Sequence, residues 1–131
     1  MAKLSIVRAP PGFGKSTWAK KNFNCIILEN DMFQYKDGKY CWSPKGAKDA
    51  IKRVLELTKD LLSNGIDVCV ANTFTKARFV ESYKRIAEEH GAAFEVFRMT
   101  KEYTNVHNVP KDVLKSMKEN FEDYPGETFV E

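Results

Sequence analysis

Residues 8–18 of the chain, RAPPGFGKSTW, determine its fold class. They follow the apolar stretch KLSIV at residues 3–7, which predicts a short buried strand, and they open a stretch that predicts a helix to about Asn22. The residues GFGKST at 12–17 are typical of a phosphate-binding loop, in which backbone N–H groups and a helix N-terminus surround a triphosphate. Strand, loop and helix occur in the order that this motif requires, so we expect a nucleotide site here.

The residues of this loop have separate predicted tasks. Lys15 would reach the β- and γ-phosphates of ATP and act in catalysis, while the Ser16 hydroxyl would bind Mg²⁺. Gly12 and Gly14 would allow the close backbone approach that a Cβ atom obstructs. The full pattern has glycine five residues before Gly14, where this chain has Ala9, and the alternative to a nucleotide site is a glycine-rich turn that caps an ordinary helix. The predicted nucleotide-binding residues are Pro11, Gly12, Phe13, Gly14, Lys15, Ser16 and Thr17.

Length and composition favour one compact domain over residues 1–131, because 43% of the residues are hydrophobic and 30% are charged. The net charge of +3 is mild, so composition alone does not indicate a nucleic-acid partner. We expect a cytoplasmic protein without membrane contact, since no apolar run is long enough to span a bilayer or form a signal-peptide core. Cys25, Cys41 and Cys69 fit neither a disulfide framework nor a zinc motif, and we expect buried thiols.

Further strands are predicted from apolar runs at residues 25–28, 67–71 and 93–97, and we expect the strand at 25–28 to be buried. Together with residues 3–7 they alternate with helical stretches, which is typical of a parallel sheet with helices on both faces. We expect a three-layer α/β fold of the P-loop NTPase type, with four strands, or five if residues 123–131 add one. Ligands of such sheets bind beyond the carboxyl ends of the strands.

Three more helices are predicted from apolar spacing and capping signals. Ser43 and Pro44 would begin a helix that Asn64 and Gly65 end. Thr75 would cap the next helix, which ends at Gly91, and a last helix would follow Pro110. The predicted inner face of the third helix of the chain carries Phe79, Val80, Tyr83, Ile86 and Ala87, and that of the last carries Val113, Leu114, Met117 and Phe121.

Asp31 falls just past the carboxyl end of the predicted strand at 25–28. There it would face the phosphate loop and accept a proton from an attacking hydroxyl, while Lys15 and Mg²⁺ stabilise charge on the phosphoryl group. The alternative is an aspartate that only shapes a turn or caps a helix. Aromatic residues surround it in the sequence, and their rings would either stack on a nucleobase of a single-stranded substrate or pack into the core. They are Phe33, Tyr35, Tyr40 and Trp42.

Four stretches resemble, in order and spacing, the kinase domain of phage polynucleotide 5′-kinases and related P-loop kinase-like proteins. They are GFGKSTWAKKNF at 12–23, ENDMFQ at 29–34, NGIDVCVANTFTKARFVESYKRIAEEHG at 64–91 and NVHNVPKDVLKSMKENFE at 105–122. The resemblance implies transfer of the γ-phosphate of ATP, with Mg²⁺, to the 5′-hydroxyl end of DNA or RNA, as in nucleic-acid end repair. Some relatives phosphorylate small molecules instead.

The resemblance also implies roles for single residues. Lys15 and Ser16 match the phosphate and Mg²⁺ residues of the family, and Asp31 matches its general base. Gln34 stands where the phage enzymes have an arginine three residues after the base. At the end of the third strand, Ala71 or Asn72 takes the place of an acidic residue.

The lid of these kinases carries an arginine where this chain has Thr104, and no arginine follows Arg98. A lysine or histidine at this place would be a point charge without the planar fork of a guanidinium. Lys101, His107 and Lys111 are the candidates for this substitution. Arg78 and Arg98 would meet phosphates or remain as solvated surface charge. The predicted substrate-binding residues are Gln34, Arg78, Lys101 and His107.

Two alternatives to a polynucleotide 5′-hydroxyl kinase therefore stay open. One is a kinase for a nucleoside or another small metabolite, which would share every donor-side residue and differ in the acceptor pocket. The other is a nucleotide-binding module in which phosphoryl transfer has been lost, which the missing lid arginine would allow.

Overall fold

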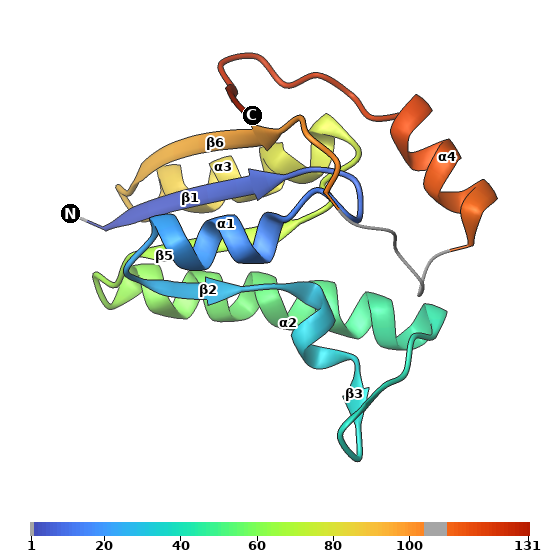
Figure 1. The fold of residues 1–131 in the computed structure, drawn as a ribbon. Helices are drawn as coiled ribbons and strands as arrows, with labels where there is room; N and C mark the ends of the chain where they lie inside the picture. Colours follow the sequence, from blue (N-terminus) through green and yellow to red (C-terminus); the bar gives the residue numbers. More distant parts are fainter. Residues whose placement is uncertain (1, 104–109) are drawn as a thin grey trace.

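A computed structural model describes residues 2–103 and 110–131 (Figure 1). Its main sheet has five parallel strands in the order β2-β5-β1-β6-β7. The strands are β1 (Lys3–Arg8), β2 (Ile26–Leu28), β5 (Val68–Asn72), β6 (Ala93–Met99) and β7 (Thr128–Val130). The predicted three-layer α/β fold is confirmed, and β7 is the fifth strand that the C-terminal residues add.

Four helices pack around this sheet or extend from its carboxyl edge: α1 (Lys15–Asn22), α2 (Pro44–Ser63), α3 (Ala77–Glu89) and α4 (Lys111–Glu119). A 3₁₀ helix, η1 (Asn30–Phe33), and a small hairpin of β3 (Tyr35–Lys36) and β4 (Lys39–Tyr40) connect β2 to α2. The start of α2 is as predicted, since the Ser43 hydroxyl accepts a hydrogen bond from the Gly46 N–H at 3.0 Å and Pro44 begins the helix.

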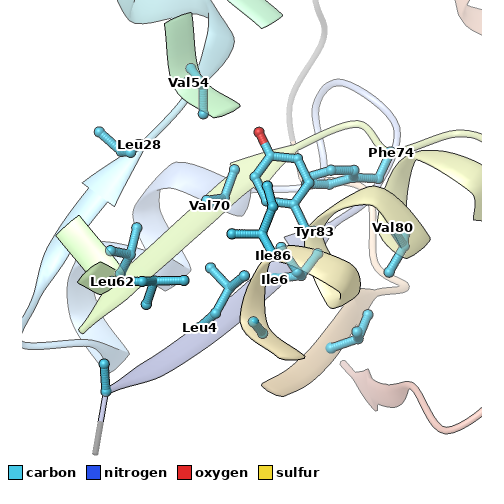
Figure 2. Packing of buried hydrophobic residues seen from close by; sticks show 14 of the residues in the cluster. Leu4, Ile6, Leu28, Val54, Leu62, Val70, Phe74, Val80, Tyr83 and Ile86 are labelled. Atoms are coloured by element: carbon cyan, nitrogen blue, oxygen red, sulfur yellow. The ribbon is translucent and has the colours of Figure 1, made fainter. Parts of the chain in front are cut away.

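The larger core lies between the sheet and the pair α2 and α3 (Figure 2). Leu4 and Ile6 of the central strand pack there against side chains of α3 such as Tyr83 and Ile86. A smaller core on the other face joins β1 to α1, where Val7 packs near Ala19. Because β1 is covered on both faces, it is buried continuously from Leu4 to Arg8, as is typical of a central parallel strand.

The expected burial of the strand at residues 25–28 and of the cysteine thiols holds only in part. Ile26 is exposed, since β2 is an edge strand and only part of its run is covered. Cys69 in β5 is buried, and burial raises the pKa of its thiol to about 12, but Cys25 is half-buried and Cys41 is exposed. No helix within residues 2–103 and 110–131 is both long and apolar enough to cross a membrane.

The start of α3 differs from the prediction. Thr75 does not cap the helix, which is preceded by Lys76. The cap comes instead from a distant residue, because a carboxylate oxygen of Glu122 accepts the Ala77 N–H at 2.8 Å. Phe79 was expected on the inner face but is 44% exposed, and its ring lies against the guanidinium of Arg78.

The last helix also differs from the prediction. It ends at Glu119, so Phe121 lies beyond it, beneath the guanidinium groups of Arg8 and Arg98 at 4.3 and 4.7 Å from the ring centre. No residue of α4, which is described throughout, is fully buried. From α4 the chain returns along the molecule to place β7 beside β6 (Figure 1).

Candidate active site

A cleft of about 850 Å³ opens at the carboxyl ends of β1, β2 and β5, where the strand order brings three loops together. The phosphate loop and η1 line it. The start of α2, the loop after β5 and one side of α4 complete it. Its lining residues among those described are Pro11, Gly12, Gly14, Lys15, Ser16, Thr17, Glu29, Asn30, Asp31, Gln34, Tyr35, Trp42, Ala47, Ile51, Ala71, Asn72, Thr73, Pro110, Val113 and Met117.

The backbone of the phosphate loop has the conformation that its glycines permit. Gly12 and Gly14 have φ values of 87° and 73°, in the left-handed region that favours glycine. A Cβ atom on Gly14 would lie 3.3 Å from the ring of Tyr103, whose N–H donates to the Gly12 carbonyl at 2.9 Å. The first turn of α1 carries no acidic residue and no side-chain cap, so its N–H groups remain open to an anion.

Lys15 lies in the cleft, where its Nζ donates to the Pro10 carbonyl at 3.2 Å. Burial lowers the pKa of Lys15 to about 8, and the carboxylates of Asp31 and Glu29 oppose this shift. The three groups therefore lie within electrostatic reach of one another. Asp31, on η1, lines the same cleft as the phosphate loop.

Glu29 is the residue of the site that sequence reasoning missed. Its carboxylate accepts a hydrogen bond from the Ser16 hydroxyl, which links the end of β2 to the start of α1. A hydroxyl and a carboxylate are the oxygen ligands that Mg²⁺ prefers, so this pair fits the ion that the phosphate loop implies. The sequence carries a signal for it, because Glu29 directly follows a predicted strand, as does Asp31 two residues later.

Asn72 is the last residue of β5, where the resemblance to polynucleotide kinases predicts an acidic residue. Its Oδ1 accepts the Asn30 N–H at 2.7 Å, and its Nδ2 donates to the Asn30 Oδ1 at 3.1 Å. This double contact fixes η1, and with it Asp31, to the neighbouring strand. The amide therefore has a positioning role that a carboxylate could not fill in both directions, since an ionised carboxylate only accepts.

Three of the four aromatic side chains near Asp31 are described, and they lie outside the core. Tyr35 and Trp42 line the cleft and are 59% and 61% exposed, which excludes core packing for both. Phe33 is exposed as well. Gln34 also lines the cleft but is only 7% exposed, and its Oε1 has no hydrogen-bond partner among the described residues.

The other predicted contact residues are not brought to the cleft by the described structure. Phe13 packs against the smaller core, and Arg78 lies on α3 beside Phe79. Lys101 lies 5.3 Å from the centre of the Tyr103 ring, close to the phosphate loop but outside the cleft lining. Thr104 and His107 fall outside the described residues, so the predictions made for them stay predictions.

Arg8 is the last residue of β1 and lies outside the cleft lining. Its side chain is fully buried, and its Nε and Nη2 donate to the Phe74 carbonyl at 3.1 and 2.7 Å. Nη2 also donates to the Glu122 carbonyl at 2.7 Å, and Nη1 forms an ion pair with Glu127 at 2.7 Å. Burial lowers the pKa of Arg8, while Glu127 opposes the shift. One side chain thus ties β1 to the loop after β5 and to the C-terminal segment.

Arg98, the last arginine of the chain, belongs to the same network and lies outside the cleft lining. Its Nη1 forms ion pairs with Asp123 and Glu127, and its guanidinium lies over the rings of Phe121 and Phe129. The described cleft therefore takes its positive charge from Lys15.

Known proteins resemble this chain in sequence and in structure. An uncharacterized protein of Pasteurella multocida (strain Pm70) is 30% identical over 142 residues, covering 95% of this chain and 79% of that protein. A putative kinase from Chloroflexus aurantiacus has a TM-score of 0.72 at 16% identity, over 98% of this chain and 84% of its own. A chain of the Pnkp1/Rnl/Hen1 complex has a TM-score of 0.59 at 24% identity, over 87% of this chain and 38% of its own.

The two structural similarities establish the fold, which is that of P-loop kinases. A family model described as an AAA domain matches residues 4–101, a range that runs from β1 past β6 and contains the phosphate loop, Glu29 and Asp31. The chain belongs to this AAA domain family.

Proposed function

We propose that this chain transfers the γ-phosphate of ATP to a hydroxyl group, and that its preferred acceptor is the 5′-hydroxyl end of DNA or RNA. The observation that carries the proposal is the shared cleft of Lys15 and Asp31, close enough that the carboxylate opposes the fall in the pKa of the lysine. A cation for the donor phosphates and a base for the acceptor are thereby available to one substrate pair.

On the donor side, the loop N–H groups and Lys15 bind the β- and γ-phosphates. Ser16 and Glu29 would hold Mg²⁺, which neutralises charge on the phosphates when it is bound. Lys15 is already directed into the cleft by its bond to the Pro10 carbonyl, so it exchanges one oxygen partner for others when ATP binds.

On the acceptor side, Asp31 accepts the proton of the attacking hydroxyl. A bond forms between the hydroxyl oxygen and the γ-phosphorus, the bond from that phosphorus to the β–γ bridging oxygen breaks, and ADP leaves. Asn72 positions the base through Asn30. The 5′-end acceptor is supported by the resemblance of the phosphate loop and of residues 29–34 to polynucleotide kinases, and by the exposed rings of Tyr35 and Trp42 beside the base.

The test is transfer of γ-³²P from ATP with Mg²⁺ to a 5′-hydroxyl oligonucleotide, with nucleosides and small sugars assayed in parallel. Asp31→Asn should lower kcat by about 100-fold or more while ATP still binds, because loss of a general base costs about 10²–10⁴ in rate. Asp60→Asn, a change on the exposed face of α2, is the matched control and should keep the full rate.

Label on a small acceptor alone would replace the polynucleotide acceptor by a metabolite. ATP binding without label on any acceptor would contradict phosphoryl transfer and leave a nucleotide-binding module. Equal rates for the wild type and Asp31→Asn would remove Asp31 from the mechanism.

A further inference from the structure

The cleft has two chemically different halves. The ionised side chains, Lys15, Glu29 and Asp31, lie at the phosphate loop and η1. Away from them the described lining is aromatic, aliphatic or a neutral amide: Gln34, Tyr35, Trp42, Ala47, Ile51, Val113 and Met117. This second half is where an acceptor has to lie if its hydroxyl is to reach Asp31. We call it the acceptor half.

The aromatic wall of the acceptor half is held in place by its hairpin. The Cys41 N–H donates to the Gln34 carbonyl at 2.7 Å, and Tyr35 pairs with Tyr40 in the two short strands. Tyr35 and Trp42, which are separated in sequence by this hairpin, both line the cleft. Both rings stay largely exposed, although each exposed ring has a cost in water.

The amide of Gln34 is a further feature of the acceptor half. The side chain is 93% buried at the wall of the cleft, yet its Oε1 has no hydrogen-bond partner among the described residues. Buried amide oxygens are normally paired. The oxygen is covered in this structure, so a nucleobase N–H would bond it only after the side chain turns into the cleft.

From this arrangement we infer that the acceptor half binds a single nucleobase against Tyr35 and Trp42, so that the protein recognises the terminal nucleoside unit and not the phosphate backbone behind it. The inference rests on the proposed function for its orientation toward Asp31. The two carboxylates beside the acceptor half repel a phosphodiester, which agrees with recognition through the base. Affinity should therefore depend little on oligonucleotide length or on salt.

A binding experiment tests this without turnover. The chain has two tryptophans, Trp18 and Trp42, and Trp18 packs against Phe23 and Phe97 outside the cleft lining. The protein is first saturated with Mg²⁺ and a non-hydrolysable ATP analogue, and a nucleoside, a 5′-hydroxyl oligonucleotide or ribose is then added. We expect the nucleoside and the oligonucleotide to quench tryptophan fluorescence in Trp18→Phe and not in Trp42→Phe, with dissociation constants within about threefold of each other.

Kinetics separate stacking from a structural effect of the substitution. Trp42→Ala should raise the KM for the acceptor about tenfold or more and leave the KM for ATP unchanged, and Trp42→Phe should restore most of the loss. Phe79→Ala removes an exposed ring on α3 and is the matched control.

Quenching that survives in Trp42→Phe, an affinity that rises steeply with oligonucleotide length and falls with salt, or equal binding of ribose would each overturn the inference. Phosphoryl transfer without Trp42-dependent quenching would leave the proposed function standing and the base-binding inference refuted. Trp42-dependent quenching without transfer to any acceptor would support base binding and refute the proposed function.

Discussion

Lys15 is a cation that the folded chain holds in a poorly hydrated position before any phosphate arrives. Its pKa falls to about 8 from an ordinary value of 10.5 because burial disfavours the charged form. Between these two pH values the unfolded chain keeps a proton that the folded chain lacks. The free energy of unfolding therefore rises with pH across this range, and the cost of the buried charge is fully present below pH 8.

We predict that Lys15→Met stabilises the nucleotide-free protein at pH 7 by up to roughly 3 kcal/mol, the free energy that corresponds to the pKa shift. At pH 10 the gain should be much smaller, since wild-type Lys15 is then largely neutral. Urea unfolding at both pH values measures the difference. Lys59→Met, on the exposed side of α2, is the control, and an equal gain at both pH values would show that charge burial is not the cause.

Glu29 allows a second prediction at the same scale. Glu29→Gln keeps the size of the side chain and removes its charge, so the Mg²⁺ concentration for half-maximal binding of a fluorescent ATP analogue should rise about tenfold or more. Binding of the analogue without Mg²⁺ should be nearly unchanged. Glu56→Gln, on α2 and exposed, is the control. An unchanged Mg²⁺ requirement in Glu29→Gln would remove the carboxylate from the metal site.

Among the elements, the C-terminal segment is tied to the sheet by a buried ion pair. Arg8 is fully buried and Glu127 is 3% exposed, so removal of either partner leaves a charge in a dry position. We predict that Arg8→Met and Glu127→Gln each lower the free energy of unfolding by about 3–5 kcal/mol, and that the double variant loses less than the sum. Asp123→Asn, at the exposed end of the network, should cost less than about 1 kcal/mol.

Urea unfolding of the four proteins, including the wild type, gives the coupling free energy. Strict additivity would show that the pair acts through separate contacts, such as the bonds of Arg8 to the Phe74 carbonyl, and not through its ion pair.

Sequence predicted those elements whose signals are local. Ser43 and Pro44 give the start of α2, and the strands at residues 3–8 and 68–72 are short, mainly apolar stretches. The cap of α3 could not be predicted in the same way, because its acceptor, Glu122, is supplied by a segment far along the chain. The prediction that Phe79 lies on the buried face of α3 was wrong, since helical spacing does not say how wide a face of the helix the rest of the fold covers.

For the whole molecule, the strand order decides which loops form the site. Loops after β2, β5 and β1 lie at neighbouring carboxyl ends, and this edge was predictable from the alternation of strands and helices. The hydrogen bonds between Ser16 and Glu29 and between Asn30 and Asn72 could not be predicted in this way. They depend on β5 lying between β2 and β1. The family resemblance predicts a role for Asp31, but it offers no guide to the buried Arg8.

The central place of β1 also affects how the chain acquires its structure. Among the strands of the sheet β1 is synthesised first, yet its neighbours are β5 and β6, so it has no partner until Val68–Asn72 has been made and only one until Ala93–Met99 follows. Such non-local pairing slows folding, since long loops must close before contacts reward them. β1 therefore stays without a sheet partner until β5 has been made, and the phosphate loop attached to it takes shape only after that.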